Sequence, residues 1–230
     1  MLPVAILAGG LATRLRPLTE TIPKALVEIN GEPFLAHQLR LLRHSGIDRV
    51  VLCAAYRGEQ IREYAGDGRA FGLRIEYSFD GPKLLGTAGA IRRALRLLGD
   101  KFFVLYGDSY LPCDYAAVES IFLESRRAAL MTVFPNSGRW DLSNVEYRQG
   151  HIWAYDKVNR TSAMRHIDYG LGAFRRDAFE ALPKGQSVDL AAVYQDLVSR
   201  RELAAYEVPT RFYEIGSPEG IRELSEFLAR

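Results

Sequence analysis

The sequence is poor in the residue types that mark several specialised classes of protein. Its 230 residues include two cysteines, Cys53 and Cys113, which are too few and too isolated for a disulfide framework or a zinc site. No window of about twenty apolar residues occurs, so no transmembrane helix is expected. The chain starts at once with a strand-like segment, without the charged region and cleavable apolar stretch of a secretory signal. We therefore expect a cytoplasmic protein with no membrane partner.

An excess of one charge sign is also lacking. Acidic and basic residues are interspersed and the formal net charge is +2, so no nucleic-acid partner is expected. The four histidines, which are His37, His44, His151 and His166, follow no catalytic or metal-binding spacing. Paired arginines are predicted to lie on solvated helix faces or at helix ends, and they are Arg92-Arg93, Arg126-Arg127, Arg175-Arg176 and Arg200-Arg201.

Apolar periodicity predicts an α/β fold. In the first half, strands at 3–8, 49–54, 73–78 and 101–106 alternate with helices at about 33–45 and 87–98 and with a short helix around Ile61. This alternation favours a mostly parallel sheet with helices on both faces. The length allows a single domain at 1–230, with halves at about 1–110 and 111–230.

The second half is less regular. We expect a helix at 114–126, a strand at 128–134, a strand at 168–174, a helix at 189–200, and strands at 203–208 and 211–215. A hairpin is predicted from strands at 143–147 and 151–156, with Gln149-Gly150 as its turn. The last helix is expected to start with Ser217 as its N-cap and Pro218 at its first position.

The most informative segment follows the first predicted strand, where Leu7-Ala8-Gly9-Gly10-Leu11-Ala12-Thr13-Arg14 leads towards Pro23-Lys24. Consecutive glycines let backbone N–H groups approach an anion with no Cβ in the way. Arg14 can grip phosphate oxygens with its planar guanidinium, and Lys24 adds a compact positive charge. These residues predict a nucleoside triphosphate site.

Two common phosphate motifs do not account for this loop. A dinucleotide fingerprint requires a third glycine, and a Walker A loop requires Gly-Lys followed by Ser or Thr; neither is present. Taken alone, the glycines also fit an ordinary strand-to-helix turn with Arg14 and Arg16 in solvent.

The longer pattern resembles a known family. Leu-Ala-Gly-Gly-x-x-Thr-Arg-Leu-x-Pro-Leu-Thr followed by Pro23-Lys24 is similar to the start of the sugar-1-phosphate nucleotidyltransferases, including the mannose- and heptose-1-phosphate guanylyltransferases. The resemblance continues through Gly86-Thr87-Ala88-Gly89, Tyr106-Gly107-Asp108, Asp156-Lys157 and Ile215-Gly216-Ser217. It implies a Rossmann-like, mostly parallel sheet flanked by helices, with a nucleotide-binding first half and a sugar-phosphate-binding second half. It also implies a role in nucleotide-sugar and polysaccharide biosynthesis.

Some positions depart from the family pattern. Ala12 stands where a second loop glycine is usual, Ala25 where a second proline is usual, and Glu214 and Ser217 where aspartate and threonine are usual. Alanine excludes the positive-φ conformations that glycine visits freely, so Ala12 bears on the expected geometry of the loop and not on its expected phosphate chemistry.

The resemblance assigns roles in the nucleotide half. Arg14 would neutralise the leaving pyrophosphate and Lys24 would bridge the reacting phosphates. The nucleotide would contact Leu7, Ala8, Gly9, Gly10, Thr13, Gly86 and Thr87. The backbone at Gly86 would read the base edge, and the wording Leu-Gly-Thr-Ala-Gly favours GTP. Thr87 is also interpreted as the N-cap of the helix that follows.

The resemblance implies Mg²⁺ as the cofactor, held by Asp108 and Glu214. Asp108 follows a hydrophobic strand through Gly107, so its carboxylate is delivered to the edge of the sheet where ligands of open α/β folds bind. Mg²⁺ takes one or two carboxylates together with phosphate oxygens. The plainer interpretations are a turn aspartate and an exposed edge-strand glutamate.

The acceptor site is expected in the second half. Lys157 resembles the family's lysine that binds the sugar phosphate, although a lysine at a strand end is more often a solvated charge. Asp168, Tyr169 and Gly170 resemble the segment that holds the sugar ring, and Asp168 is the candidate for acceptor selectivity because its carboxylate can bind sugar hydroxyls.

These roles predict direct substitution at the α-phosphorus, with catalysis by positioning and charge neutralisation. The expected partners are a nucleoside triphosphate and a hexose or heptose 1-phosphate, with a homodimer as one option. Three alternatives stay open: a UTP-, dTTP- or CTP-dependent member, an enzyme with a non-sugar acceptor such as phosphocholine or a molybdenum cofactor, and an inactive regulatory subunit that binds nucleotide sugars.

Overall fold

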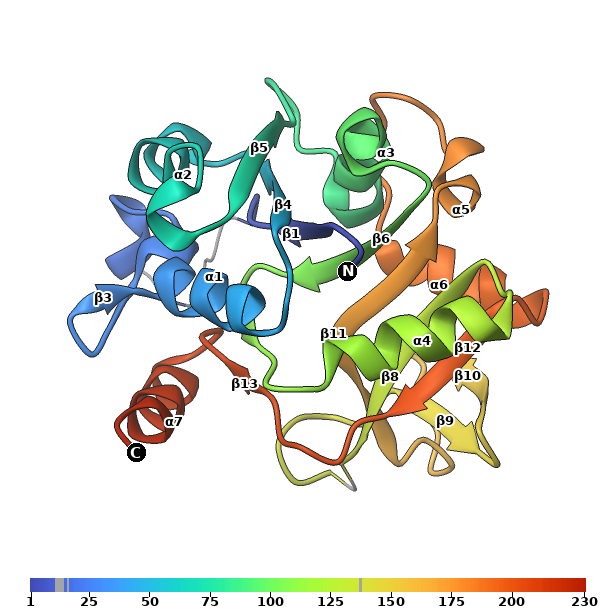
Figure 1. Cartoon of the computed structure of the whole chain (residues 1–230). Coiled ribbons are helices and arrows are strands. Elements are labelled where there is room, and N and C mark those ends of the chain that lie inside the picture. Colours follow the sequence, from blue (N-terminus) through green and yellow to red (C-terminus); the bar gives the residue numbers. More distant parts are fainter. Residues whose placement is uncertain (11–14, 16, 137) are drawn as a thin grey trace.

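A central sheet of nine strands runs through the computed structural model, which describes residues 1–10, 15, 17–136 and 138–230 (Figure 1). Seven of these strands follow the order β10-β9-β11-β6-β1-β4-β5, while β8 pairs with β11 and β12. The strands are β1 Val4–Leu7, β4 Arg49–Ala54, β5 Arg74–Phe79, β6 Lys101–Tyr106, β8 Ala129–Pro135, β9 Val145–Arg148, β10 His151–Tyr155, β11 His166–Arg175 and β12 Leu203–Glu207. Strands β6, β1, β4 and β5 are parallel, and β11 joins them antiparallel through β6.

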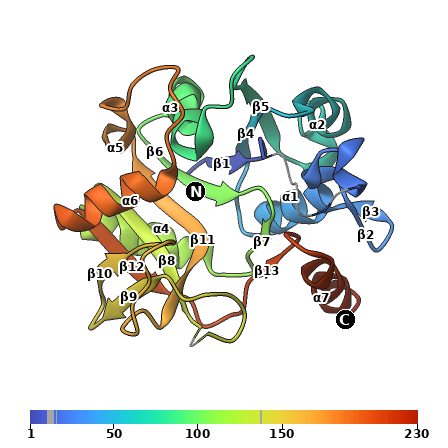
Figure 2. The ribbon, with the colours of Figure 1, turned by 180° about the vertical axis from the view of Figure 1, so that it is seen from behind.

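Helices cover both faces of the sheet, as the alternating pattern predicts. They are α1 Phe34–His44, α2 Gly58–Ala65, α3 Gly86–Leu98, α4 Tyr115–Ser125, α5 Asp177–Glu180, α6 Leu190–Ser199 and α7 Pro218–Leu228. Successive strand residues point to opposite faces, so Val4 and Ile6 pack in the cluster under α1, α2 and α4, whereas Ala5 packs in the cluster under α3, α5 and α6. In Figure 2, turned by 180°, α6 comes to the front. The predicted α/β class is confirmed.

The predicted start of the last helix and the predicted hairpin turn are also confirmed. The Ser217 side chain caps α7 by accepting the Gly220 N–H at 3.1 Å, and Pro218 occupies the first turn. The β9–β10 hairpin turns at Gln149 and Gly150, whose φ angles of 52° and 79° are the pair that a tight hairpin turn requires. Cys53 is 2% exposed, and burial raises the pKa of its thiol to about 12.

Other elements differ from the prediction. The strand expected at 211–215 is reduced to β13 Tyr213–Glu214, because its partner β7 Ser109–Tyr110 offers two residues to pair with. Helix α5 was not predicted, since four residues carry too little periodicity to detect. The remaining short elements are β2 Glu28–Ile29, β3 Glu32–Pro33 and the 3₁₀ turns η2 Leu18–Glu20, η3 Lys24–Leu26 and η4 Arg69–Phe71. Among the described residues, no helix is both long and apolar enough to cross a bilayer.

Gly107 allows the ends of β6 and β1 to lie close together. A Cβ at this position would lie 2.4 Å from the carbonyl oxygen of Leu7, a distance that real Cβ atoms do not reach. The Gly107 N–H donates to that same carbonyl at 3.1 Å. Glycine is therefore required here, and it brings Asp108 against the loop that follows β1.

Candidate active site

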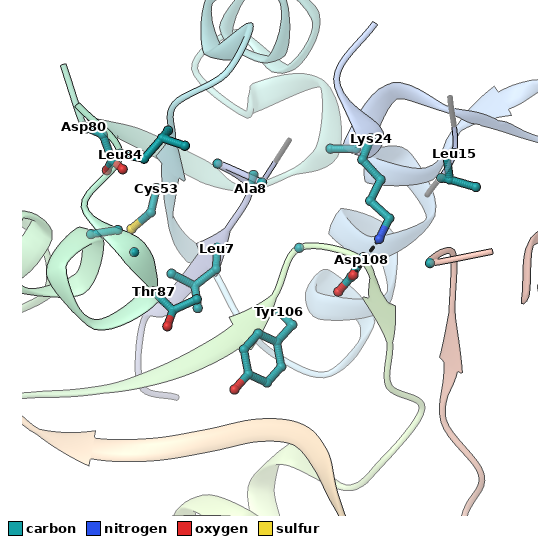
Figure 3. Close-up of a pocket in the computed structure, with 17 residues that line it drawn as sticks. Leu7, Ala8, Leu15, Lys24, Cys53, Asp80, Leu84, Thr87, Tyr106 and Asp108 are labelled. Atoms are coloured by element: carbon teal, nitrogen blue, oxygen red, sulfur yellow. Dashed lines mark hydrogen bonds and ion pairs between the residues drawn. The ribbon is translucent and has the colours of Figure 1, made fainter. Parts of the chain in front are cut away.

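A cavity of about 420 Å³ opens at the carboxyl ends of β1, β4 and β6 (Figure 3). Parallel strands end at the same edge of a sheet, which is where open α/β folds bind ligands. Its lining includes most of the predicted nucleotide-binding residues, namely Leu7, Ala8, Gly9, Gly10, Lys24, Gly86, Thr87 and Asp108. The structure therefore brings together residues as far apart in the chain as Leu7 and Asp108.

The two loop glycines line this cavity in different ways. A Cβ on Gly9 would lie 3.0 Å from the Cβ of Ala55, so Gly9 permits close packing against the end of β4. A Cβ on Gly10 would meet nothing within 4 Å among the described atoms, so this glycine leaves open space beside the cavity. The Ala8 N–H donates to the Cys53 carbonyl at 2.8 Å and fixes the start of the loop.

Thr13 and Arg14, with Ala12 and Arg16, lie outside the described residues, so their predicted roles stay predictions. The chain on either side of them is at the cavity, because Gly10 and Leu15 both line it. Leu15 is 5% exposed.

Lys24 and Asp108 form an ion pair at one end of the cavity. Lys24 begins η3 and Asp108 follows β6, and the Lys24 Nζ donates to the Asp108 Oδ2 at 2.7 Å. Their side chains are 16% and 32% exposed, so both remain accessible from the cavity. The pair combines a cation that can neutralise phosphate with a carboxylate that can hold a metal.

Helix α3 begins at Gly86, whose φ of +68° and whose approach to Val188 require glycine. The predicted N-cap role of Thr87 is wrong, because Leu85 occupies that position. Thr87 Oγ1 instead accepts the N–H of Leu190, the first residue of α6, at 2.6 Å, beside the N-cap Asp189. This contact spans 103 residues, so local sequence cannot reveal it. The N–H groups of Ala88 and Gly89, in the next positions of α3, donate to the Val188 carbonyl.

Asp80 is a lining residue that the sequence analysis missed. It follows β5, is 7% exposed and accepts the Leu85 N–H through Oδ2 at 2.8 Å. Burial raises the pKa of Asp80 above the ordinary aspartate value, opposed by the Leu85 N–H and by the charge of Arg93. Figure 3 places Asp80 with Leu84 and Cys53 at the end of the cavity away from the Lys24–Asp108 pair. Its position after a predicted strand was the available signal.

A second cavity of about 330 Å³ adjoins the first and shares Tyr106 and Asp108 with it. All the residues predicted for the acceptor and the metal line it, namely Lys157, Asp168, Tyr169, Gly170, Asp108 and Glu214. Asn144 and Arg160, which the sequence analysis did not select, line it as well.

Asp168 is half-buried and held by several donors. Its Oδ2 accepts the hydroxyls of Tyr155 at 3.3 Å and Tyr106 at 3.5 Å, and its Oδ1 accepts the Gly170 N–H at 3.1 Å. Burial raises the pKa of Asp168, and the charge of Lys157 is the main opposing influence. The carboxylate is thus fixed in orientation at the cavity wall.

Lys157 extends over the ring of Tyr106, with its Nζ 5.1 Å from the ring centre and 3.5 Å from the hydroxyl. It is exposed, and it forms no ion pair with another described residue. An aromatic face can hold an ammonium group in place without neutralising it. Its charge is therefore available to a phosphate in the second cavity.

Tyr169 and Gly170 contribute to the cavity through different groups. Tyr169 is 1% exposed and its ring packs edge-on against Phe212 at 6.0 Å, so the ring belongs to the hydrophobic core. Gly170 has a φ of +103° beside a bulge in β11, and a Cβ there would touch the Tyr106 ring at 3.4 Å. Glycine therefore keeps this wall open.

Asp108 directly precedes β7, and Glu214 lies in β13, the strand that pairs with β7. Glu214 pairs with Ser109, and the Ile215 N–H donates to the Asp108 carbonyl at 2.9 Å. Within the described part of the chain, no group of three or more His, Cys, Asp or Glu residues is placed to hold a metal. A pair of carboxylates still fits Mg²⁺, which keeps waters and takes phosphate oxygens as further ligands.

Comparisons with known proteins agree with this arrangement. The family model described as "Nucleotidyl transferase" matches residues 4–139. The D-glycero-alpha-D-manno-heptose 1-phosphate guanylyltransferase of Campylobacter jejuni is 29% identical over 93% of this chain and 94% of its own. A UTP--glucose-1-phosphate uridylyltransferase of Synechocystis is 30% identical over 80% of this chain, which spans about half (52%) of that relative. The crystal structure of HddC from Yersinia pseudotuberculosis, complexed with GMP-PN, matches with a TM-score of 0.80 and 25% identity over 99% of this chain and 100% of that one.

Proposed function

This chain belongs to the nucleotidyl transferase family, and from that premise we propose that it transfers a nucleotidyl group from a nucleoside triphosphate to a sugar 1-phosphate. The observation that carries the proposal is the junction of two cavities at Tyr106 and Asp108, beside the Lys24 cation. One cavity ends in a glycine loop suited to phosphates, and the other holds Lys157 and Asp168, which suit a phosphate and a hydroxyl. A reacting phosphate at the junction would face both.

The proposed reaction is direct substitution at phosphorus. A phosphate oxygen of the sugar 1-phosphate attacks the α-phosphorus in line, a new P–O bond forms, and the bond to the β-phosphate oxygen breaks to release pyrophosphate. The acceptor phosphate is already ionised, so no residue has to remove a proton from it. Catalysis then depends on positioning and charge neutralisation, as in other phosphoryl-group transfers.

Lys24 would neutralise the reacting phosphates, because its Nζ contacts Asp108, which lines both cavities. Arg14 is proposed to bind the departing pyrophosphate, which suits a planar guanidinium that grips two oxygens at once. Asp108 and Glu214 would hold Mg²⁺, which when bound withdraws charge from phosphate oxygens. Lys157 would place the acceptor phosphate.

Asp80 favours GTP as the donor. Its Oδ2 accepts the Leu85 N–H, and its Oδ1 makes no hydrogen bond to another described residue. A carboxylate accepts hydrogen bonds, and guanine offers two adjacent donors, its ring N1–H and its exocyclic amino group. Uracil and thymine offer one N–H flanked by carbonyl oxygens that a carboxylate repels. UTP is the second candidate, since the Synechocystis relative is named for it.

The acceptor is proposed to be a hexose or heptose 1-phosphate. Asp168 is oriented by Tyr155, Tyr106 and the Gly170 N–H, and a fixed carboxylate can select among sugar hydroxyls. The Campylobacter relative is named for a heptose 1-phosphate, which places heptoses in the panel to be tested.

The test is pyrophosphate release from a matrix of nucleoside triphosphates against hexose and heptose 1-phosphates, with phosphocholine as the non-sugar acceptor and Mg²⁺ present. Release that requires both GTP and a sugar 1-phosphate is the expected result. Turnover with phosphocholine alone would replace the acceptor class, and nucleotide-sugar binding without any turnover would identify a regulatory subunit.

A further inference from the structure

A basic hollow lies between α3 and α5, outside the two cavities described above. It measures about 630 Å³, and its walls carry Arg92, Arg93, Arg96, Arg176 and Lys184 with a single acidic residue, Glu180. Leu85, Gly89 and Leu95 give it an apolar floor. The first turns of α3 separate this hollow from the first of those cavities, which we call the nucleotide cavity. Gly86, Thr87 and Ala90 line the nucleotide cavity, while Leu85 and Gly89 line the hollow.

Most of this positive charge is not neutralised within the chain. Arg176 forms an ion pair with Glu180 at 2.7 Å and also donates to the Leu95 carbonyl at 3.1 Å. Arg96 and Lys184 form no ion pair with any residue that the structure describes. Arg93 forms none either, although its charge acts on the Asp80 carboxylate. The Arg92 side chain donates to the Leu182 carbonyl at 3.4 Å, which leaves its charge uncompensated.

The sequence predicts that Arg92-Arg93 and Arg175-Arg176 lie on solvated helix faces or at helix ends. Arg92 and Arg93 do lie on α3, where Arg93 is exposed, and Arg176 lies at the start of α5. The fold in addition places Arg92, Arg93 and Arg176 around one hollow. Arg92 and Arg96 are four residues apart on one helix, where like charges repel. The helix dipole favours a cation in the last turn of α3, which accounts for Arg96 but not for Arg92 and Arg93.

We propose that this hollow binds a phosphorylated small molecule with at least two negative charges, at a site separate from the nucleotide and acceptor cavities. The arginine side chains of α3, together with Arg176 at the N-cap of α5, can grip phosphate oxygens in pairs, and an anion between them would relieve their mutual repulsion. The hollow is larger than the nucleotide cavity, so it has room for a multiply phosphorylated ligand over its apolar floor. The site does not depend on the reaction proposed above.

The test is equilibrium binding of inorganic tripolyphosphate by calorimetry, with a non-hydrolysable GTP analogue filling the nucleotide cavity. The double variant Arg92→Ala/Arg96→Ala should bind at least about tenfold more weakly, because it removes two charged donors. Its matched control, Arg69→Ala/Arg74→Ala, removes the same charge from side chains that are 90% and 73% exposed, and it should bind as the unaltered protein does.

A third variant tests the hollow without removing an arginine. Glu180→Gln deletes its one acidic group and should tighten tripolyphosphate binding, whereas a merely structural role for Glu180 predicts no change. Equal weakening in both double variants would show that only net charge matters and would overturn the proposal. So would an unaltered affinity in Arg92→Ala/Arg96→Ala once its melting temperature shows that it is folded.

Discussion

Lys24 and Asp108 are 84 residues apart in the chain, and their side chains meet at 2.7 Å between Nζ and Oδ2. The contact joins the loop after β1 to the end of β6, the strand that Gly107 presses against β1. Opposite charges thereby face the same junction of the two cavities. A phosphate there would meet a cation and a carboxylate that are already in place, and with the proposed function this preorganisation is the basis of the predictions below.

Removal of the Asp108 carboxylate should abolish turnover while the fold persists. Asp108→Ala is expected to lower kcat by about a thousandfold, the scale of one preorganised electrostatic contact. Glu214→Asp should retain or improve activity, because it restores the residue usual in the family. Steady-state kinetics over a Mg²⁺ titration measure both effects. If Asp108→Ala keeps a near-normal kcat at saturating Mg²⁺, the metal assignment is wrong.

Arg14 should act mainly as pyrophosphate leaves. Arg14→Ala is therefore expected to lower kcat by about a hundredfold or more and to change nucleotide affinity much less. Arg14→Lys should restore little activity, because an ammonium group lacks the paired donors of guanidinium. A change confined to KM would instead show that Arg14 stabilises the bound substrate and the transition state equally.

Lys157 and Asp168 should affect acceptors in different ways. Lys157→Ala removes the phosphate contact common to all acceptors, so kcat/KM should fall similarly for every sugar 1-phosphate. Asp168→Ala should penalise the true acceptor more than a deoxy analogue that lacks the contacted hydroxyl, since the analogue has no such bond to lose. Measurement over a matched deoxy-sugar series decides between them, and an equal loss across the series would remove Asp168 from the specificity pocket.

Asp80 should determine the choice of base. An amide both donates and accepts, so Asp80→Asn should pair less well with guanine and better with uracil, shifting the GTP-to-UTP ratio of kcat/KM by about tenfold or more. Kinetics with the two triphosphates measure the ratio. An unchanged ratio would show that Asp80 does not contact the base.

The effect of Asp80→Asn on stability provides a control that the variant is folded. Burial raises the pKa of Asp80 in the folded chain, so the folded state binds this proton more tightly than the unfolded state does. The ionised carboxylate therefore destabilises the folded state increasingly as the pH rises above its unfolded pKa of about 3.9. Asp80→Asn should raise the melting temperature at pH 7, and the advantage should vanish near pH 4.

Gly107 and Gly10 should respond differently to the same substitution. Gly107→Ala forces a Cβ against the Leu7 carbonyl, so it should lower the free energy of unfolding by about 1–3 kcal/mol and displace Asp108. Gly10→Ala meets no described atom within 4 Å, so it should leave stability nearly unchanged and weaken nucleotide binding instead. Denaturant titration and nucleotide affinity separate the two outcomes. Equal stability losses would contradict the packing argument.

The sequence by itself determined the elements and the family. Strand and helix periods are local properties, so α1, β4, α3 and β6 fall within one or two residues of their predicted bounds. The turn at Gln149-Gly150 and the cap at Ser217 were predictable for the same reason, because each depends on the preferences of neighbouring residues. The loop motif likewise predicted that Gly9, Gly10 and Lys24 belong to one site, and all three line the first cavity.

Only the tertiary structure decided which distant groups meet. It joined Lys24 to Asp108, bound Thr87 to the first N–H of α6, and buried the ring of Tyr169 against Phe212. It also placed Asp80 at the end of the first cavity away from Lys24 and Asp108, and it gathered the arginines of α3 and Arg176, which precedes α5, around one hollow. Such contacts depend on the order of strands in the sheet and on how helices pack across it. The spacing of residues along the chain does not specify these relationships, because they form only when the whole core is assembled.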